Sequence, residues 1–295
     1  MACTQGTADD YTDLLNKVAD FVTTDAELTE QGQHWEILKR VDIGYYFKAP
    51  GLSGKEQIYI NMDCLESEKQ DYYNWSIRGA QGFDSTQSMA DQPRATESYL
   101  TLWNKAIPYW LIANGQRLIV VAKVSTHYTF CYLGKFCPYA TPGQYPYPVV
   151  IAGDARYSDK KWSEEGSDHR TLQSPYKTTV VYLPGGESIP IERMSHGFYE
   201  QDVDLFPTHE GMLGSNVVQQ NKDGGYTLLH YILYSFEFGT LKSSYDALGE
   251  LDGVYWVTGH NNFSGNQIEI KGTPHLVIQN VYRTSWRDYC AIALK

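Results

Sequence analysis

Three short motifs carry residue types that could do chemistry, and each lacks part of the required signature. The stretch 51–55, GLSGK, resembles a phosphate-binding loop, but the GxxxxGK[ST] spacing is missing and the carboxylate of Glu56 would repel phosphate. His209-Glu210 lacks the second histidine of a zinc-protease helix. Ser195-His196 are adjacent, and sequence neighbours rarely face one another as a nucleophile and its base must. These motifs predict no catalytic site.

Clustered carboxylates are the remaining candidates for metal binding or hydrolysis. Glu200, Asp202 and Asp204, in YEQDVDLF, could hold a calcium ion on one strand edge, although carboxylates two residues apart more often form the solvent face of a strand. Glycan hydrolysis needs two placed carboxylates. The only clustered candidates for that pair are Glu164, Glu165, Asp202 and Asp204. We therefore predict that the protein is not an enzyme and has no cofactor or metal site.

Tyrosine is unusually abundant, with 24 residues against 10 phenylalanines. Tyrosine is enriched at protein interfaces, where a large ring carries a hydroxyl that can still be hydrogen-bonded, but it also suits a large antiparallel sheet. Tyr139, Tyr145, Tyr147 and Trp162 could alternatively stack on sugars. An interface role, a core role and carbohydrate binding therefore all stay open for these residues.

Charge and cysteine usage narrow the classes of partner. A net charge of −11 argues against a nucleic-acid-binding surface, which needs clustered Lys and Arg. The longest apolar stretches are shorter than the roughly 20 residues that span a bilayer, and residues 1–15 do not resemble a secretory signal. The five cysteines form no CxxC motif, which indicates free thiols. We expect a protein made in the cytoplasm, with no nucleic-acid or membrane partner.

Two patterns predict the elements around which the chain is built. Apolar residues recur at three- and four-residue spacing over 9–22, which predicts one amphipathic helix with Thr7 as its cap. In 109–152, two apolar runs flank Asn114-Gly115, a pair typical of a type I′ hairpin turn. The second run, LIVVAKV, is apolar almost throughout, which predicts a strand covered on both faces.

The remaining sequence reads as short strands separated by turns, so the predicted fold is mainly β. We expect an antiparallel β-sandwich or barrel-like core with a short N-terminal α-helix. The clearest late feature is a hairpin over 267–281 that turns at Lys271-Gly272. The predicted divisions are an N-terminal helical arm (1–30), a β-rich subdomain (31–153), a polar loop or joint (154–176) and a second β-rich subdomain (177–295).

Three long stretches together resemble a family of tailed-bacteriophage virion proteins. They are QIYINMDCLESEKQDYYNWSIRGAQGF, IPYWLIANGQRLIVVAKVSTHYTFCYLGKFCPYATPGQYPYPVVIAG and GVYWVTGHNNFSGNQIEIKGTPHLVIQNVYRTSWRDYCAIAL. The resemblance implies a structural component of the neck, collar, tail or baseplate, located in the virion. It implies no catalytic residues. The alternative is a carbohydrate- or receptor-binding module at the tail tip or baseplate.

A virion subunit of this kind would bind copies of itself, as a homo-oligomeric ring, and other virion neck or tail proteins. Rings are built from head-to-tail interfaces that close on rotation. We expect the helix to act as an assembly arm and the stiff, proline-rich loop at 138–148 to form a second contact. The interface candidates are Tyr11, Leu14, Leu15, Val18, Tyr139, Tyr145 and Tyr147. Cys3, near the N-terminus, is the candidate for an interchain disulfide.

Overall fold

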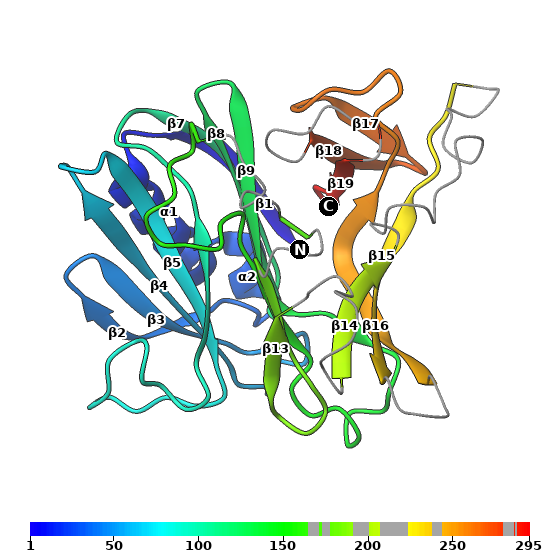
Figure 1. Ribbon diagram of the computed structural model, residues 1–295, viewed down its shortest axis with the longest axis horizontal. Coiled ribbons are helices and arrows are strands. Elements are labelled where there is room, and N and C mark those ends of the chain that lie inside the picture. Colours follow the sequence, from blue (N-terminus) through cyan, green and yellow to red (C-terminus); the bar gives the residue numbers. More distant parts are fainter. Residues whose placement is uncertain are drawn as a thin grey trace.

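The computed structural model is mainly β and consists of three antiparallel sheets and two N-terminal helices. It describes residues 1–164, 171–172, 178–190, 201–206, 224–237, 244–279, 286 and 288–295. Figure 1 shows the three sheets side by side as layers, with a central sheet between the other two. The predicted fold class, an antiparallel β-sandwich-like core with a short N-terminal helix, is confirmed.

The central sheet contains seven strands in the order β1-β7-β8-β9-β11-β12-β13. These strands are β1 (Ala2–Ala8), β7 (Ile107–Ala113), β8 (Arg117–Val124), β9 (His127–Lys135), β11 (Val149–Ala152), β12 (Thr179–Tyr182) and β13 (Ser188–Pro190). Because β11 pairs with β12, this sheet draws strands from both sides of residues 154–176. The predicted joint therefore falls inside one sheet.

A five-stranded sheet and a second seven-stranded sheet cover the two faces of the central one. The helix-side sheet has the order β2 (Glu36–Val41), β3 (Gly44–Ala49), β4 (Ile58–Ser67), β5 (Tyr72–Ala80) and β6 (Thr96–Leu100). The C-terminal sheet has the order β14 (Gln201–Phe206), β15 (Leu229–Glu237), β16 (Ser244–Trp256), β19 (Tyr289–Ala293), β18 (Thr273–Gln279) and β17 (Gln267–Ile270), and the short β10 (Cys137–Pro138) pairs with β16. Each of these sheets builds a separate core against one face of the central sheet.

Strand β8 shows how one sheet serves two cores. Leu118, Val120 and Ala122 belong to the core on the helix side, whereas Ile119 and Val121 belong to the core on the C-terminal side. All five side chains are fully buried. Successive residues of a strand point to opposite faces, so a strand buried on both sides must be apolar at every position. The prediction that this strand is covered on both faces is confirmed.

The predicted helix is present as α1 (Tyr11–Thr24), and a short helix α2 (Ala26–Glu30) follows it. Asp10, rather than Thr7, caps α1: its side chain accepts hydrogen bonds from the backbone N–H groups of Thr12 and Asp13. The helix lies between the helix-side sheet and the central sheet and contributes to the core that they share.

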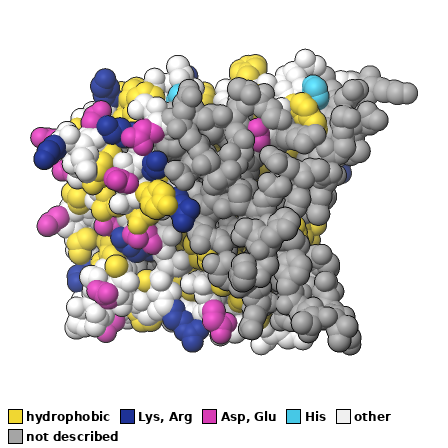
Figure 2. Space-filling model, viewed as in Figure 1, with side chains coloured by type: hydrophobic (Ala, Val, Ile, Leu, Met, Phe, Trp, Pro, Cys, Tyr) yellow, Lys and Arg dark blue, Asp and Glu magenta, His cyan; other side chains and the backbone are white. Residues whose placement is uncertain are grey.

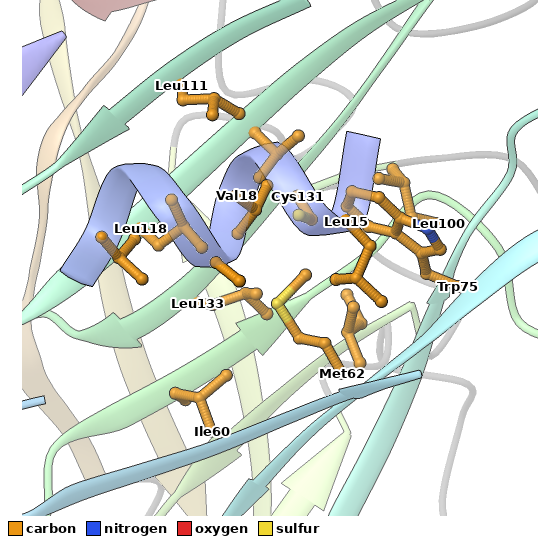
Figure 3. Packing of buried hydrophobic residues seen from close by; sticks show 14 of the residues in the cluster. Leu15, Val18, Ile60, Met62, Trp75, Leu100, Leu111, Leu118, Cys131 and Leu133 are labelled. Atoms are coloured by element: carbon orange, nitrogen blue, oxygen red, sulfur yellow. The ribbon is translucent and has the colours of Figure 1, made fainter. Parts of the chain in front are cut away.

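The apolar stripe of α1 is therefore part of the core. Tyr11, Leu14, Leu15 and Val18, four of the predicted interface residues, are each at most 5% exposed. Figure 3 shows Leu15 and Val18 among core side chains of the two sheets, including Met62 of β4. A helix inserted between two sheets of its own chain cannot be an arm that docks on a neighbour. This corrects the prediction of a helical arm over 1–30.

The sequence predicts glycine turns at two hairpins, and the structure has the type I′ geometry at only one of them. Lys271 and Gly272 both have positive φ, at 51° and 79°, and they join the paired residues Ile270 and Thr273, as a type I′ turn requires. Asn114-Gly115 also joins a hairpin, β7 to β8, but neither residue has positive φ, so the predicted type I′ turn is wrong there.

The Asn114 side chain closes the β7–β8 connection instead, by accepting from the N–H groups of Gln116 and Arg117. Gly115 is required for close approach, because a Cβ atom there would lie 2.2 Å from the carbonyl oxygen of Gly51. The Gly51 N–H donates to the Gly115 carbonyl at 2.6 Å. The glycine-rich stretch 51–55 thus begins by packing against this hairpin.

Side chains of both charge signs are interspersed over the described part of the face shown in Figure 2, with hydrophobic side chains between them. The described residues contain no helix long and apolar enough to cross a membrane. This face therefore carries the mixed pattern of an ordinary solvated surface, and candidate sites must be sought in particular edges and cavities.

Candidate functional site

The three tyrosines of the proline-rich loop differ in how deeply they are buried. Tyr139 is 54% exposed, and its hydroxyl donates to Glu250 at 3.2 Å. Tyr145 is buried, donates to the backbone carbonyl of Tyr182 and packs edge-on against Phe136 with a centroid distance of 5.5 Å. Of the predicted contact residues in this loop, Tyr139 is exposed and Tyr145 is a core residue, which corrects the interface prediction for Tyr145.

Tyr147 joins two sheets. Its hydroxyl donates to the backbone carbonyl of Ala80 on β5 and accepts from the N–H of Tyr59 on β4 at 3.2 Å. Its ring packs edge-on against Tyr182 of the central sheet, and burial raises the pKa of its hydroxyl. Tyr147 therefore fixes the loop to the helix-side sheet instead of presenting a contact surface.

Replacing Tyr145 by phenylalanine is expected to lower the free energy of unfolding by about 0.5–1.5 kcal/mol, because one buried hydrogen bond to the Tyr182 carbonyl is lost. The Tyr139→Phe variant is the matched control and should differ from the wild type by less than about 0.5 kcal/mol, since Tyr139 is exposed. Urea unfolding of both variants measures the difference. Equal stabilities would show that the hydrogen bond to the Tyr182 carbonyl does not stabilise the fold.

An open edge of the central sheet is the first candidate site. Strand β1 ends the sheet, and within the described residues its one neighbouring strand is β7. Ala2 and Ala8 anchor it in the core, while Cys3, Gln5 and Thr7 are exposed. The strand, ACTQGTA, contains no charged residue and no proline. We call this strand, with the side of it that faces away from β7, the β1 edge.

Cys3 lies on the β1 edge and is the one exposed cysteine. Cys64, Cys131 and Cys290 are buried, and Cys137 is half-buried. Neighbouring groups that exclude water from the sulfur, together with Glu27, raise the pKa of the Cys3 thiol. At neutral pH the thiol is therefore mostly protonated, and its oxidation should accelerate as the pH rises.

A polar row across the helix-side sheet forms the second candidate site. Cross-strand pairing places one residue from each strand side by side, in the order Lys39, Tyr46, Asn61, Arg78 and Glu97. A β-bulge between Ile37 and Lys39 shifts the register of β2 and sets Lys39 opposite Tyr46. The alternate residues of β4, Ile60 and Met62, point into the core, so the row occupies the outer face.

Arg78 is the charged centre of this row and is only 8% exposed. Its guanidinium donates to Asp63 through Nη1 and to Glu97 through Nη2. Burial would raise the pKa of Glu97, but hydrogen bonds from Ser76 and Tyr99 and the charge of Arg78 outweigh burial and lower it. Burial raises the pKa of Asp63 in spite of Arg78. Of the two carboxylates, Asp63 is therefore the one whose burial is not fully offset by hydrogen bonds and the charge of Arg78.

The loop after β5 and the row together border an open cavity of about 500 Å³. Lys39 Nζ donates to the Ser85 carbonyl at 2.9 Å, and the side-chain amide of Gln92 donates to the carbonyls of Asp84, Gln87 and Ser88. The residues around the cavity are Lys39, Val41, Tyr46, Asp63, Arg78, Thr86, Gln87, Ser88, Met89 and Ala90. We call this space the β-face cavity.

The predicted carboxylate cluster is only partly within the described residues. Glu164 forms an ion pair with Lys160, four residues earlier, at 3.7 Å, which is an ordinary surface interaction. Asp202 and Asp204 lie on β14, where they pair with Phe236 and Tyr234. Glu165, Glu200, Ser195-His196 and His209-Glu210 lie outside the described residues. Among those that are described, no group of His, Cys, Asp or Glu could hold a metal ion.

The sequence contained a signal for the β-face cavity that motif searching misses. Asn61 and Asp63 alternate with apolar residues in β4, and Ser76 and Arg78 do the same in β5, so both strands have one polar face. Polar side chains facing one another under a loop indicate a site only when the strand pairing is known. No model of a known protein family matches the chain, and no curated protein matches it. The roles of the cavity and the β1 edge must therefore be argued from the residues that form them.

Proposed function

We propose that the protein is a structural component of a tailed-bacteriophage virion, a ring-forming neck, collar or tail subunit that binds copies of itself and other virion proteins. The β1 edge is the observation that carries the proposal, because among the described residues no strand pairs with its outer side at the end of a seven-stranded sheet. The long stretches that resemble phage virion proteins support it independently.

The contrast between two sheet edges supports an assembly role for β1. Strand β2, which ends the helix-side sheet, carries charged residues and a β-bulge, both of which are features that prevent edge-to-edge pairing. The β1 edge has neither feature over its seven residues. An unprotected edge that pairs with a strand of a neighbouring copy gains main-chain hydrogen bonds along its length. Repeated head-to-tail, such pairing closes a ring.

Lysines on the β1 edge are expected to disrupt self-association without unfolding the chain. The Gln5→Lys/Thr7→Lys variant places two charges on exposed positions of the strand, and like charges on facing strands oppose pairing. Sedimentation analysis over a range of concentrations should show an oligomer for the wild type and a monomer for the variant. The control, Ser53→Lys/Gln70→Lys, adds the same charge at exposed loop positions and should assemble normally.

Cys3 supplies a second readout of the same interface. A head-to-tail ring places β1 against a different strand of the neighbour and should protect Cys3 from alkylation. Where the β1 strands of two copies meet instead, mild oxidation should yield covalent dimers on non-reducing gels, faster at alkaline pH because the thiol pKa is raised. Cys3→Ser should remove them. A wild type that stays monomeric at every concentration, with Cys3 as reactive toward alkylation as in the Gln5→Lys/Thr7→Lys variant, would contradict assembly through this edge.

A further inference from the structure

The β-face cavity has the features of a built ligand site and is independent of assembly through the β1 edge. Its volume, about 500 Å³, lies within the range of about 300–1,000 Å³ typical of small-molecule pockets. Its floor is a row of side chains on rigid, paired strands, and its wall is a loop fixed by the Gln92 amide. A site on paired strands can hold its side chains in place without a ligand.

Polar groups in this region retain unused bonding capacity. The Nε of Arg78 and the Nδ2 of Asn61 are buried and have no hydrogen-bond partner among the described residues. Arg78 is 8% exposed and lines the cavity, and Asn61, at 2%, stands between Tyr46 and Arg78 in the row. Buried donors without partners cost free energy, and such exceptions call for an explanation.

The charges of the lining decide the class of ligand. Lys39 and Arg78 contribute two positive charges, and Asp63 and the adjoining Glu97 contribute two negative charges, so the formal sum is zero. Arg78 already binds both carboxylates, which leaves little positive charge for an anionic ligand. A charged ligand would therefore lose its hydration without gaining a dedicated counter-ion, so the cavity favours an uncharged ligand.

The neutral groups of the lining match a polyhydroxylated molecule. Thr86 and Ser88 place hydroxyl groups at the exposed rim, where they donate to Asp84 and Asp91, so their oxygens can accept hydrogen bonds from a ligand. Val41, Met89 and Ala90 provide apolar wall for carbon-bound hydrogens. A sugar ring combines these two requirements, with hydroxyls at its edge and C–H groups on its faces.

We propose that the β-face cavity binds one unit of an uncharged saccharide, whose hydroxyl groups donate to the Asp63 carboxylate and accept from the Lys39 ammonium. Lys39 donates to the Ser85 carbonyl and has further N–H donors for a ligand. Asp63 accepts from Arg78 through Oδ1, and a carboxylate has capacity to accept further hydrogen bonds from a ligand. The β-bulge in β2 aligns Lys39 with the row and so belongs to the construction of the site.

The test is binding of the full chain to an array of uncharged and acidic saccharides, followed by titration of the strongest hit. Lys39→Met should weaken binding about tenfold or more, because a charged hydrogen bond is lost. Ala90→Trp should abolish binding by filling the cavity from an exposed position, without touching the ion pairs. The control is Lys48→Met, on the same strand face as Tyr46 but outside the lining, which should bind as the wild type does.

Saturable binding of an uncharged saccharide that both cavity variants reduce, with melting temperatures unchanged, would support the site. No saturable binding to any array member, a preference for acidic saccharides, or equal binding by Ala90→Trp and the wild type would overturn it. These outcomes are independent of sedimentation behaviour, so failure here leaves the assembly proposal standing, and the reverse also holds.

Discussion

Deleting residues 1–25 is expected to leave a chain that does not fold. The deletion removes β1 and the whole of α1, whose seven buried residues are Tyr11, Leu14, Leu15, Val18, Ala19, Phe21 and Val22. Burial of the six larger side chains stabilises the fold by roughly 9–18 kcal/mol at about 1.5–3 kcal/mol each. A folded domain typically has a net stability of only about 5–15 kcal/mol. Circular dichroism and urea unfolding of the truncated chain would measure the loss.

A point variant tests the same account within a chain that still folds. Leu15→Ala should lower the free energy of unfolding by about 2–5 kcal/mol, because a cavity opens between the helix and the two sheets. Asp20→Ala, at an exposed position of the same helix, should change it by less than about 0.5 kcal/mol. A truncated chain that folds normally, or equal stability of both point variants, would restore the idea of a separate arm.

Replacing Asp252 is expected to have the second large effect. Asp252 Oδ2 accepts from Arg117 Nε at 2.8 Å, and Arg117 is 1% exposed. Asn114 and Gln116 donate to the same carboxylate, at 3.0 and 3.1 Å. These bonds connect the β7–β8 hairpin of the central sheet to β16 of the C-terminal sheet. Asp252 therefore links the two layers at the start of β8.

Asp252→Ala should lower the free energy of unfolding by about 3–5 kcal/mol, since the buried charge of Arg117 loses its carboxylate. The double variant Arg117→Met/Asp252→Leu should lose less than the single one, because it leaves no unpaired charge behind. Urea unfolding of both variants and the wild type gives the comparison. A single variant as stable as the wild type would show that the ion pair does not join these layers.

The contribution of Asp252 should also depend on pH. Burial by itself would raise its pKa, but Arg117 and the two side-chain amides outweigh burial and hold the pKa below the ordinary 3.8. A carboxyl group whose pKa is lowered by folding stabilises the protein above its unfolded-state pKa, and that stability disappears as the pH falls through the folded-state value. The difference between the wild type and Asp252→Ala should be constant near neutrality and shrink below about pH 3.8.

Several elements of the fold were predictable because their sequence patterns reflect local physics. The stripe in α1, the unbroken apolar run of β8 and the Lys271-Gly272 turn each follow from periodicity or φ preference. Strand β1 was missed because ACTQGTA has no strong alternation of apolar and polar residues. Its place is set by pairing with β7, a partner about a hundred positions away, which no local pattern encodes.

The candidate sites were less predictable because they depend on tertiary partners. Tyr139 and Tyr145 share one proline-rich loop, yet one is exposed and the other is buried. Sequence alone assigns both the same environment, since the covering residues Phe136 and Tyr182 come from the loop's start and from another strand. The β-face cavity required the register of five strands, which places Asp63 and Arg78 together.

Quantitative mass spectrometry of purified particles, from the phage that is proposed to encode this chain, tests the proposed function most directly. A virion subunit that forms rings should be present in every particle at a copy number that matches the symmetry of a neck or tail ring. A lower copy number of this subunit in particles assembled with the Gln5→Lys/Thr7→Lys variant would show that its incorporation depends on the β1 edge. Absence of the wild-type protein from purified particles would contradict the structural role.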